Sequence, residues 1–183
     1  MATEISYLTA EQFAALPDTL NPIELVKGSL VEMNPPMPRH GEICFRVAHI
    51  LGVYLDNHAL GRIVINDSNV LIEREPDTVR GADVAYYSYE RVPKGPLPAG
   101  FLPVSPELVF EVLSPNDRWN EMLTKIADYL KAGVMTVCVL DDTTRTLQAF
   151  FPDRPPVVFA ASDEFMLPEI LREFRTTVES FFD

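Results

Sequence analysis

Between residues 107 and 140, the pattern of hydrophobic and polar positions predicts a strand, a helix and a second strand. The run ELVFEVL, which begins at Glu107, alternates as a strand does, and the stretch from about Asp117 to Ala132 has helical spacing. Gly133 is a typical residue just beyond a helix C-terminus. The next run, VMTVCVL, is almost wholly apolar, as expected of a strand covered on both faces. Such a strand–helix–strand unit predicts a right-handed crossover between two parallel strands.

The residues before this unit predict a short helix, a hairpin and a long helix. The segment TAEQFAAL opens with a capping-box pattern. Residues 23–33 read as two short strands, with Gly28 and Ser29 as the turn between them. A segment rich in proline breaks regular structure, and apolar residues then recur at helical spacing from His40 to about Asn57.

Further strands and C-terminal helices complete the expected pattern. Residues 61–74 read as a second hairpin-like pair of strands, with Asn66, Asp67 and Ser68 as the turn, and RGADVAYYS reads as a short strand. A loop rich in proline leads from there to the strand at Glu107. Near the end of the chain, TLQAFF predicts one more strand, and LPEILREFRTTVESFFD has the pattern of one or two amphipathic helical segments.

The order of these elements predicts the fold class. From His40 onward the chain reads as helix, three strands, helix and strand, with an extra strand after it. This order indicates an α/β domain, of the α+β mixed-sheet kind, with an N-terminal hairpin and C-terminal helical segments. A length of 183 residues suits a single domain over residues 1–183.

Composition fits a globular protein and lowers the expectation of nucleic-acid binding. Hydrophobic residues make up 47% of the chain, which is enough for a substantial core. The formal charge is −12 and the pI is about 4.6, whereas binding to phosphates usually relies on a basic surface. A divalent cation held by acidic residues would supply positive charge that the sequence count omits.

The cysteines and the N-terminal segment predict a reducing, cytoplasmic environment. Cys44 and Cys138 lie in apolar segments without metal-type spacing, so we expect reduced thiols. The first residues lack the basic start and apolar run of a signal peptide. No stretch reaches the roughly 18 uninterrupted apolar residues of a membrane span, so no membrane contact is expected.

Glu111 stands at the centre of the alternating strand. It shares one face with Val109 and Leu113, whereas the other face carries only apolar side chains. Burying an unpaired carboxylate costs several kcal/mol, so Glu111 requires a cation, a cluster of donors or a proton. A salt bridge to a nearby Arg or Lys is one reading, and a metal ligand is the other.

Asp83 is the second candidate carboxylate. It precedes an apolar run that we expect to be the neighbouring strand of the sheet. An aspartate near a strand start is often only a turn residue. If Asp83 and Glu111 enter one sheet from adjacent strands, however, their oxygens would lie close enough to bind a hard cation such as Mg²⁺.

Lys125 lies at the boundary of the apolar stripe of the predicted helix, one turn before Tyr129. The stripe itself consists of Trp119, Met122, Leu123, Ile126 and Leu130. Lys125 could lean over the edge of the sheet toward the carboxylates. It could instead form an exposed pair with Glu121, four residues earlier, worth only a few tenths of a kcal/mol.

Neither the histidines nor the usual short catalytic motifs identify a functional site on their own. His40, at the start of the long helix, could approach a cleft, although most such histidines are surface or cap residues. The three histidines do not form a helical metal-binding pair. The chain has no nucleophile elbow, phosphate-binding glycine loop or zinc-type cysteine pair.

Three segments resemble the bacterial putative restriction endonuclease family, also called Uma-two, of the PD-(D/E)xK nuclease superfamily. They are ELVKGSLVEMNPPMPRH, TVRGADVAYYSYERVP and PELVFEVLSPNDRWNEMLTKIADYLKAGV. The likeness spans roughly residues 20–151. Its most specific part is the strand, the SP dipeptide and the helix with YLKAGV, followed by the apolar strand and Asp141.

The resemblance implies a restriction-endonuclease-like core and a set of site residues. It implies that Asp83 and Glu111 bind metal, assisted by the backbone carbonyl of Val112. The superfamily lysine normally follows the acidic residue by two positions, but Leu113 stands there. In this family the lysine has moved to the next helix, where Lys125 matches a K-x-x-x-Y pattern with Tyr129.

One departure from the superfamily pattern and several additional residues accompany this match. Ala82 replaces the proline that precedes the aspartate in the superfamily pattern. Glu24, in the first hairpin, matches a recurrent acidic residue of the family and is a possible outer wall of the same cleft, with His40 and Tyr129 as further auxiliary residues.

The resulting hypothesis is a Mg²⁺- or Mn²⁺-dependent phosphodiester hydrolase that acts on DNA as an endonuclease and forms a homodimer. Two alternatives stay open at this point. One is a non-catalytic homodimeric binding or regulatory protein on the same fold, which the charge of −12 favours. The other is hydrolysis of a different phosphodiester, because a fold does not fix its substrate.

Overall fold

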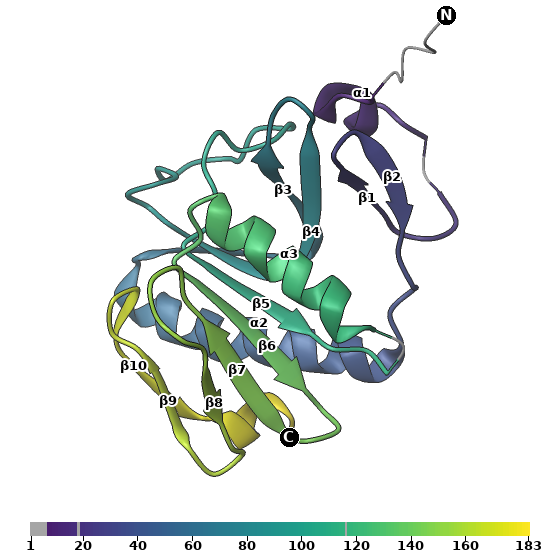
Figure 1. The fold of residues 1–183 in the computed structure, drawn as a ribbon. Helices are drawn as coiled ribbons and strands as arrows, with labels where there is room; N and C mark the ends of the chain where they lie inside the picture. The colour runs from purple at the N-terminus through teal and green to yellow at the C-terminus, as the bar shows by residue number, and fades with distance from the viewer. Residues whose placement is uncertain (1–6, 18, 116) are drawn as a thin grey trace, which may run out of the picture.

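A mixed sheet with one long helix on each face forms the body of the protein (Figure 1). The computed structural model describes residues 7–17, 19–115 and 117–183. The helices are α1 (Ala10–Ala14), α2 (Pro38–His58), α3 (Trp119–Lys131) and the 3-10 helix η1 (Val178–Phe181). The strands are β1 (Ile23–Val26), β2 (Ser29–Glu32), β3 (Gly61–Glu73), β4 (Thr78–Ser88), β5 (Leu108–Val112), β6 (Thr136–Asp141), β7 (Thr146–Phe150), β8 (Val157–Phe159), β9 (Glu164–Leu167) and β10 (Leu171–Thr177).

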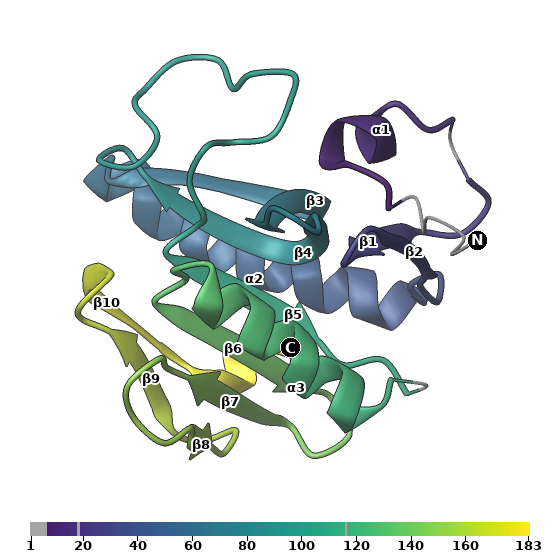
Figure 2. The same cartoon turned by 45° about the horizontal axis from the view of Figure 1, so that its top comes forward.

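The alternation along β5 separates two hydrophobic layers. Phe110 and its neighbours on one face pack with α2, η1 and the β9–β10 hairpin, whereas Val109 on the other face packs with α3. Figure 2 shows α2 and α3 on opposite sides of the central strands. β5 and β6 pair in parallel through the α3 crossover, as predicted, and the mixed α/β fold class is confirmed.

The sheet divides at β4, and this division positions the candidate site. β3 pairs with β4 along its length, from Gly61–Ser88 to Glu73–Thr78. β1 and β5 must therefore share the opposite edge of β4, where β1 pairs only at Val79 and β5 pairs from Val84 onward. On that edge, residues 80–83 of β4 have no strand partner. They face the gap between β1 and β5, which we call the split in the sheet.

β3 corrects the predicted second hairpin. Residues 61–73 form one long strand, and Asn66 and Asp67 form a bulge with φ of 71° and 51°. The pairing register with β4 shifts between Ile65 and Ser68. Asn and Asp tolerate left-handed φ in turns and in bulges alike, so the sequence signal was the same for both.

The first hairpin and the C-terminus also differ from prediction. Val26 pairs with Ser29, so the hairpin turn is Lys27–Gly28, both with positive φ, instead of Gly28–Ser29. Of the predicted C-terminal helical segments, the structure has the short 3-10 helix η1, whereas residues 171–177 form the strand β10. A bulge at Glu173 (φ 62°) gives the buried positions of this strand the three-residue spacing of a helix.

The remaining elements agree with the sequence pattern. The Thr9 capping box of α1 is present, and α2 spans the helix predicted from His40 to Asn57. Cys44 and Cys138 are free thiols. Among the described residues, no helix is both long and apolar enough to cross a membrane.

The layer under α2 can be tested with two substitutions on that helix. Leu51 is completely buried, whereas Val53 is about half exposed. We expect Leu51→Ala to lower the free energy of unfolding by about 2–5 kcal/mol, because it leaves a cavity in the core. The matched change Val53→Ala should alter it by no more than about 0.5 kcal/mol. Urea denaturation followed by circular dichroism measures both, and equal effects would contradict the assigned buried face.

Candidate active site at the split in the sheet

The split in the sheet opens into a cavity of about 350 Å³ lined by charged side chains together with apolar and neutral polar ones. β1, the bulge of β3, β4, β5, the start of α2 and α3 all contribute to its wall. The charged residues at its centre are Glu24, His40, Asp67, Arg80, Asp83, Glu111 and Lys125. The structure therefore brings together every side chain that the sequence placed in the catalytic or metal-binding set.

Three side chains form the hydrogen bonds that a neighbouring strand would otherwise form with the backbone at the split. Glu24 Oε1 accepts from the Gly81 N–H at 3.0 Å, and the Tyr129 hydroxyl lies 3.0 Å from the Gly81 carbonyl oxygen. Asp83 Oδ2 accepts from the Val112 N–H at 2.7 Å. Buried backbone groups require partners, so the split holds these functional groups in place.

Lys125 lies at the centre of the buried face of α3, which corrects the predicted stripe. Lys125 is only 8% exposed and Tyr129 is fully buried, whereas Trp119 and Leu123 are 37% and 49% exposed. The buried face is thus rotated by about one residue from the prediction. Hydrophobicity ranks Lys and Tyr as surface residues, although each can bury its stem when its polar tip has a partner.

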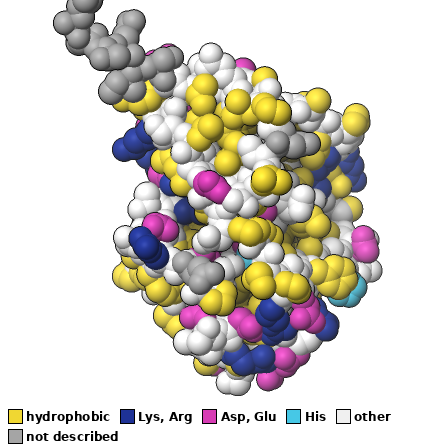
Figure 3. Space-filling model, turned by 90° about the vertical axis from the view of Figure 1, so that its right-hand side faces the viewer, with side chains coloured by type: hydrophobic (Ala, Val, Ile, Leu, Met, Phe, Trp, Pro, Cys, Tyr) yellow, Lys and Arg dark blue, Asp and Glu magenta, His cyan; other side chains and the backbone are white. Residues whose placement is uncertain are grey.

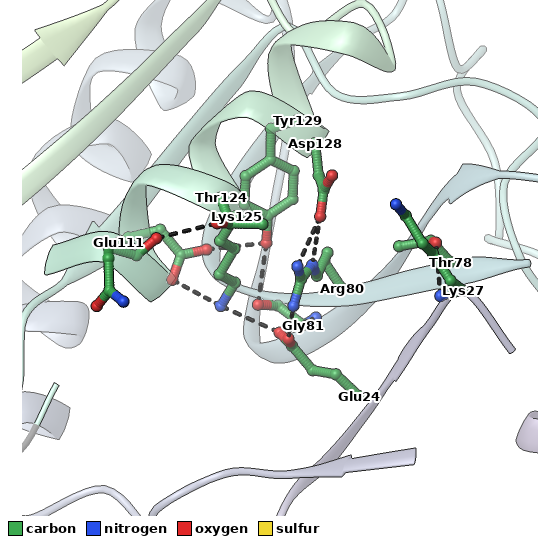
Figure 4. Close-up of polar contacts among 11 residues, drawn as sticks. Glu24, Lys27, Thr78, Arg80, Gly81, Glu111, Thr124, Lys125, Asp128 and Tyr129 are labelled. Atoms are coloured by element: carbon green, nitrogen blue, oxygen red, sulfur yellow. Dashed lines mark hydrogen bonds and ion pairs between the residues drawn. The ribbon is translucent and has the colours of Figure 1, made fainter. Parts of the chain in front are cut away.

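The partners of Lys125 are buried carboxylates from two strands (Figure 4). Its ammonium Nζ lies 2.9 Å from Glu111 Oε2 and 3.2 Å from Glu24 Oε1. The alternative of an exposed pair with Glu121 is wrong, since Glu121 lies 3.7 Å from Arg118 instead. Burial alone would lower the pKa of Lys125, but the surrounding carboxylates outweigh burial and raise it, so Lys125 is charged.

Arg80 supplies a second buried cation that sequence reasoning missed. It donates to Glu24 Oε2 at 2.7 Å and to Asp128 Oδ2 at 2.6 Å. Glu24 therefore accepts from Arg80, Lys125 and the Gly81 backbone together, and it forms an inner wall of the cavity instead of an outer one. An arginine inside an apolar strand, as in TVRGADVAYYS, was the available signal.

Glu111 is the carboxylate whose charge is least favoured. Burial raises its pKa to about 8, with Asp83 and Glu24 adding to the effect and Lys125 opposing it. The Tyr129 hydroxyl lies 2.8 Å from Glu111 Oε1 as well as 3.0 Å from the Gly81 carbonyl oxygen. The hydroxyl proton can be shared between these two oxygens, or a protonated Glu111 can donate to the Tyr129 oxygen while Tyr129 donates to Gly81.

Asp83 pairs with His40 across the other side of the cavity. His40 Nε2 lies 3.2 Å from Asp83 Oδ2. Burial alone would lower the pKa of His40, but the Asp83 carboxylate outweighs burial and raises it to about 11. Burial likewise disfavours the Asp83 carboxylate, yet His40 keeps its pKa below the ordinary value. Asp83 is an interior residue of β4, so the alternative of a turn-forming aspartate is wrong.

Asp67 lines the cavity through the β3 bulge, although the sequence pattern predicted it only as a turn residue. Burial and the neighbouring Asp83 raise the pKa of the Asp67 carboxyl group. Gly81 allows this approach, because a Cβ there would lie 3.1 Å from the Asp67 carbonyl oxygen. The Val112 carbonyl stays a predicted ligand, and the contact that the structure shows is from its N–H to Asp83.

The donor set fits a hard divalent cation. Of the described residues that line the cavity, six are acidic and four are basic. Asp67, Asp83 and Glu111 present carboxylate oxygens, the ligands that Mg²⁺ and Mn²⁺ prefer. Burial is the main cause of the raised pKa values of Glu111 and Asp67, and neighbouring carboxylates add to it, so a bound cation would favour the ionised form of both groups.

Comparisons with known proteins identify the family and the fold of the chain. The model of the family described as Uma2, putative restriction endonuclease, matches residues 10–179. Among solved structures, the crystal structure of a putative nuclease from Anabaena variabilis ATCC 29413 is similar, with a TM-score of 0.81 and 18% sequence identity. The match covers 96% of this chain and 97% of that one, and shows a shared fold. No curated protein matches the chain.

Removing the charge of Lys125 tests how strongly the buried cluster depends on it. We expect Lys125→Met to lower the free energy of unfolding by about 3–5 kcal/mol, because two buried carboxylates lose their cation. Lys131→Met is the matched control on the same helix: Lys131 is exposed and pairs with Glu73 at the surface, so at most about 1 kcal/mol should be lost. Urea denaturation measures both variants.

A second substitution separates charge from packing in the same experiment. If the loss in Lys125→Met comes from uncompensated negative charge, adding Glu111→Gln should restore part of the stability. Losses that simply add in the double variant would show that the Lys125–Glu111 contact is energetically unimportant.

Proposed function

The chain belongs to the Uma2 family of putative restriction endonucleases, and from this membership we propose that it is a Mg²⁺- or Mn²⁺-dependent endonuclease that hydrolyses phosphodiester bonds in DNA. The observation that carries the proposal is the convergence of Asp83, Glu111 and the charged Lys125 in one cavity at the split in the sheet. The family match confirms the resemblance found in the sequence.

Asp83 and Glu111 are the proposed metal ligands, with Asp67 beside them. When bound there, the divalent cation would polarise a phosphate oxygen and lower the pKa of a water molecule. Asp83 is held in position by the Val112 N–H and by His40. Glu111 is held by Lys125 and Tyr129. These contacts fix both carboxylates before substrate arrives, which lowers the cost of organising the site.

Lys125 acts in this proposal through charge and hydrogen bonding. Its raised pKa means that it does not serve as a general base. An ammonium group has three N–H donors, and two are directed to Glu111 and Glu24 in the part of the chain that the structure describes. The third is free to bind a phosphate oxygen and to stabilise charge that develops on it in the transition state.

The overall acidity of the protein makes these local cations necessary. On the face that Figure 3 shows, Lys and Arg side chains are interspersed with acidic and hydrophobic ones and form no continuous basic patch. With a formal charge of −12, long-range attraction of DNA is absent. His40, Lys125 and a bound divalent cation would supply the positive potential at the cavity itself.

Assembly and location complete the proposal. We propose a homodimer, because cutting a duplex requires an attack on each strand, and light scattering of the purified protein would reveal a monomer if this is wrong. The free thiols of Cys44 and Cys138 are compatible with a reducing cytoplasm.

The first functional test is divalent-ion-dependent cleavage of plasmid DNA. We expect cleavage with Mg²⁺ or Mn²⁺, none with EDTA, and a loss of roughly 100-fold or more in Asp83→Asn and Glu111→Gln. Glu107→Gln is the matched control, since Glu107, directly before β5, is also buried but pairs with Ser88 and Arg91 away from the cavity. Wild-type levels of cleavage in Glu111→Gln would refute the proposed site.

A second test concerns the role of Lys125. We expect Lys125→Met to lower kcat for cleavage by about 10²–10³-fold, because an electrostatic contact to the transition state is lost. Folded protein, verified by circular dichroism, should show this loss at every pH between 6 and 9. A loss that appears only toward the alkaline end of that range, where a lysine can lose its proton, would indicate a general base. Metal binding without any cleavage of DNA would favour the non-catalytic regulatory protein.

A further inference from the structure

A second set of metal-ligating atoms lies beside the carboxylate site. The side chains are those of His40, Cys44 and Asp83, each of which offers one ligand atom, and these atoms lie within 4.8 Å of one another. His40 and Cys44 are four residues apart on α2 and so lie on one face of the helix. We propose that these three residues form a binding site for a soft divalent cation such as Zn²⁺.

The distances suit tetrahedral coordination. His40 Nδ1 lies 3.5 Å from Cys44 Sγ, and His40 Nε2 lies 3.2 Å from Asp83 Oδ2. Tetrahedral bonds of about 2.0 Å to nitrogen and 2.3 Å to sulfur separate the two ligand atoms by about 3.5 Å. These two contacts use different nitrogens of His40, and one nitrogen binds one ion. A zinc ion held by Nδ1 and Cys44 Sγ would therefore require the Asp83 carboxylate to move toward it, and the three ligand atoms already lie within 4.8 Å of one another.

The chemistry of the three ligands separates this site from the one proposed for Mg²⁺. A thiolate and an imidazole favour Zn²⁺ over Mg²⁺, whereas a cluster of carboxylates alone favours Mg²⁺ or Mn²⁺. Three protein ligands would leave the fourth zinc position open, and two of the three, His40 and Asp83, line the cavity.

The surroundings hold the ligands in place. The Val112 N–H donates to Asp83 Oδ2 at 2.7 Å and fixes that carboxylate from the side of β5. His40 and Cys44 are both partly buried on the first two turns of a 21-residue helix whose apolar face is anchored in the core. Such outer contacts orient metal ligands and affect affinity strongly.

Asp83 belongs to both sites, so the two ions compete for it. Zn²⁺ bound at the His40–Cys44–Asp83 site should withdraw Asp83 from the carboxylate site and inhibit cleavage. This consequence, unlike the binding itself, rests on the proposed nuclease function. The site would thereby make the enzyme sensitive to the concentration of a thiophilic metal.

Cobalt provides a direct test that needs no cleavage assay. We expect Co²⁺ added to the reduced, metal-free protein to produce the near-ultraviolet band of a cobalt–thiolate bond together with visible bands of four-coordinate cobalt. Cys44→Ala and Cys44→Ser should abolish the thiolate band. Cys138→Ala is the matched control and should retain it, because Cys138 is completely buried in β6.

Affinity and inhibition give the remaining readouts. Since even an outer-shell partner is worth about 10–100-fold in metal affinity, Cys44→Ala should weaken Zn²⁺ binding by at least that factor in a competition assay. The Zn²⁺ concentration for half-inhibition, with each variant normalised to its own rate without Zn²⁺, should rise in parallel. A wild-type protein without the thiolate band, or an equal band in Cys44→Ala, would overturn the proposed site. Glu111→Gln should lose cleavage but keep the band, so failure of the two proposals is distinguishable.

Discussion

The absence of a strand beside residues 80–83 of β4 is the constraint on which the rest of the site depends. A split in a sheet leaves peptide groups that must be paired or solvated. Here Glu24 and Tyr129 pair with Gly81, while Asp83 reaches across to the Val112 N–H. The polar side chains of the cavity therefore replace a missing piece of β-ladder. This dual role explains how so many charged groups are held rigidly in the interior.

The charged groups in the split lower the stability of the fold, and they would favour a reaction at a phosphate group. Bringing carboxylates together inside a protein costs free energy that apolar residues of similar size would not. Lys125 and Arg80 compensate only part of that charge, as the raised pKa of Glu111 shows. This cluster lacks positive charge and is open to the cavity, so it is electrostatically complementary to a divalent cation. The proposed phosphodiesterase requires such a cation.

The sequence predicted the elements that follow from hydrophobic periodicity and from the order of elements along the chain. It missed the features that depend on β-bulges. The α3 crossover and the long helix α2 have unambiguous patterns, and both were correct. The bulge at Asn66 and Asp67 inserts one residue into β3, and the irregularity in β10 inserts three residues between Leu171 and Arg175, so β3 resembled a hairpin and β10 resembled a helix. Asp67 could not be found for this reason, since only the bulge turns it into the cavity. Cys44 could have been found, because its spacing from His40 is that of a helical ligand pair.

The position of Lys125 shows that the site requires an ammonium group beside Glu111 but does not require the lysine to occupy one particular position in the sequence. A lysine at position 113 would follow Glu111 by about 6.6 Å along the strand, where β5 has ended and the Leu113 N–H bonds to Leu140. From α3, which crosses the same face, the ammonium of Lys125 reaches to within 2.9 Å of Glu111. The helix also places Tyr129 one turn later, against the other oxygen of the same carboxylate. Moving the cation from strand to helix thus gives Glu111 two partners from one element, and it leaves the end of β5 free to hold Asp83 through its backbone.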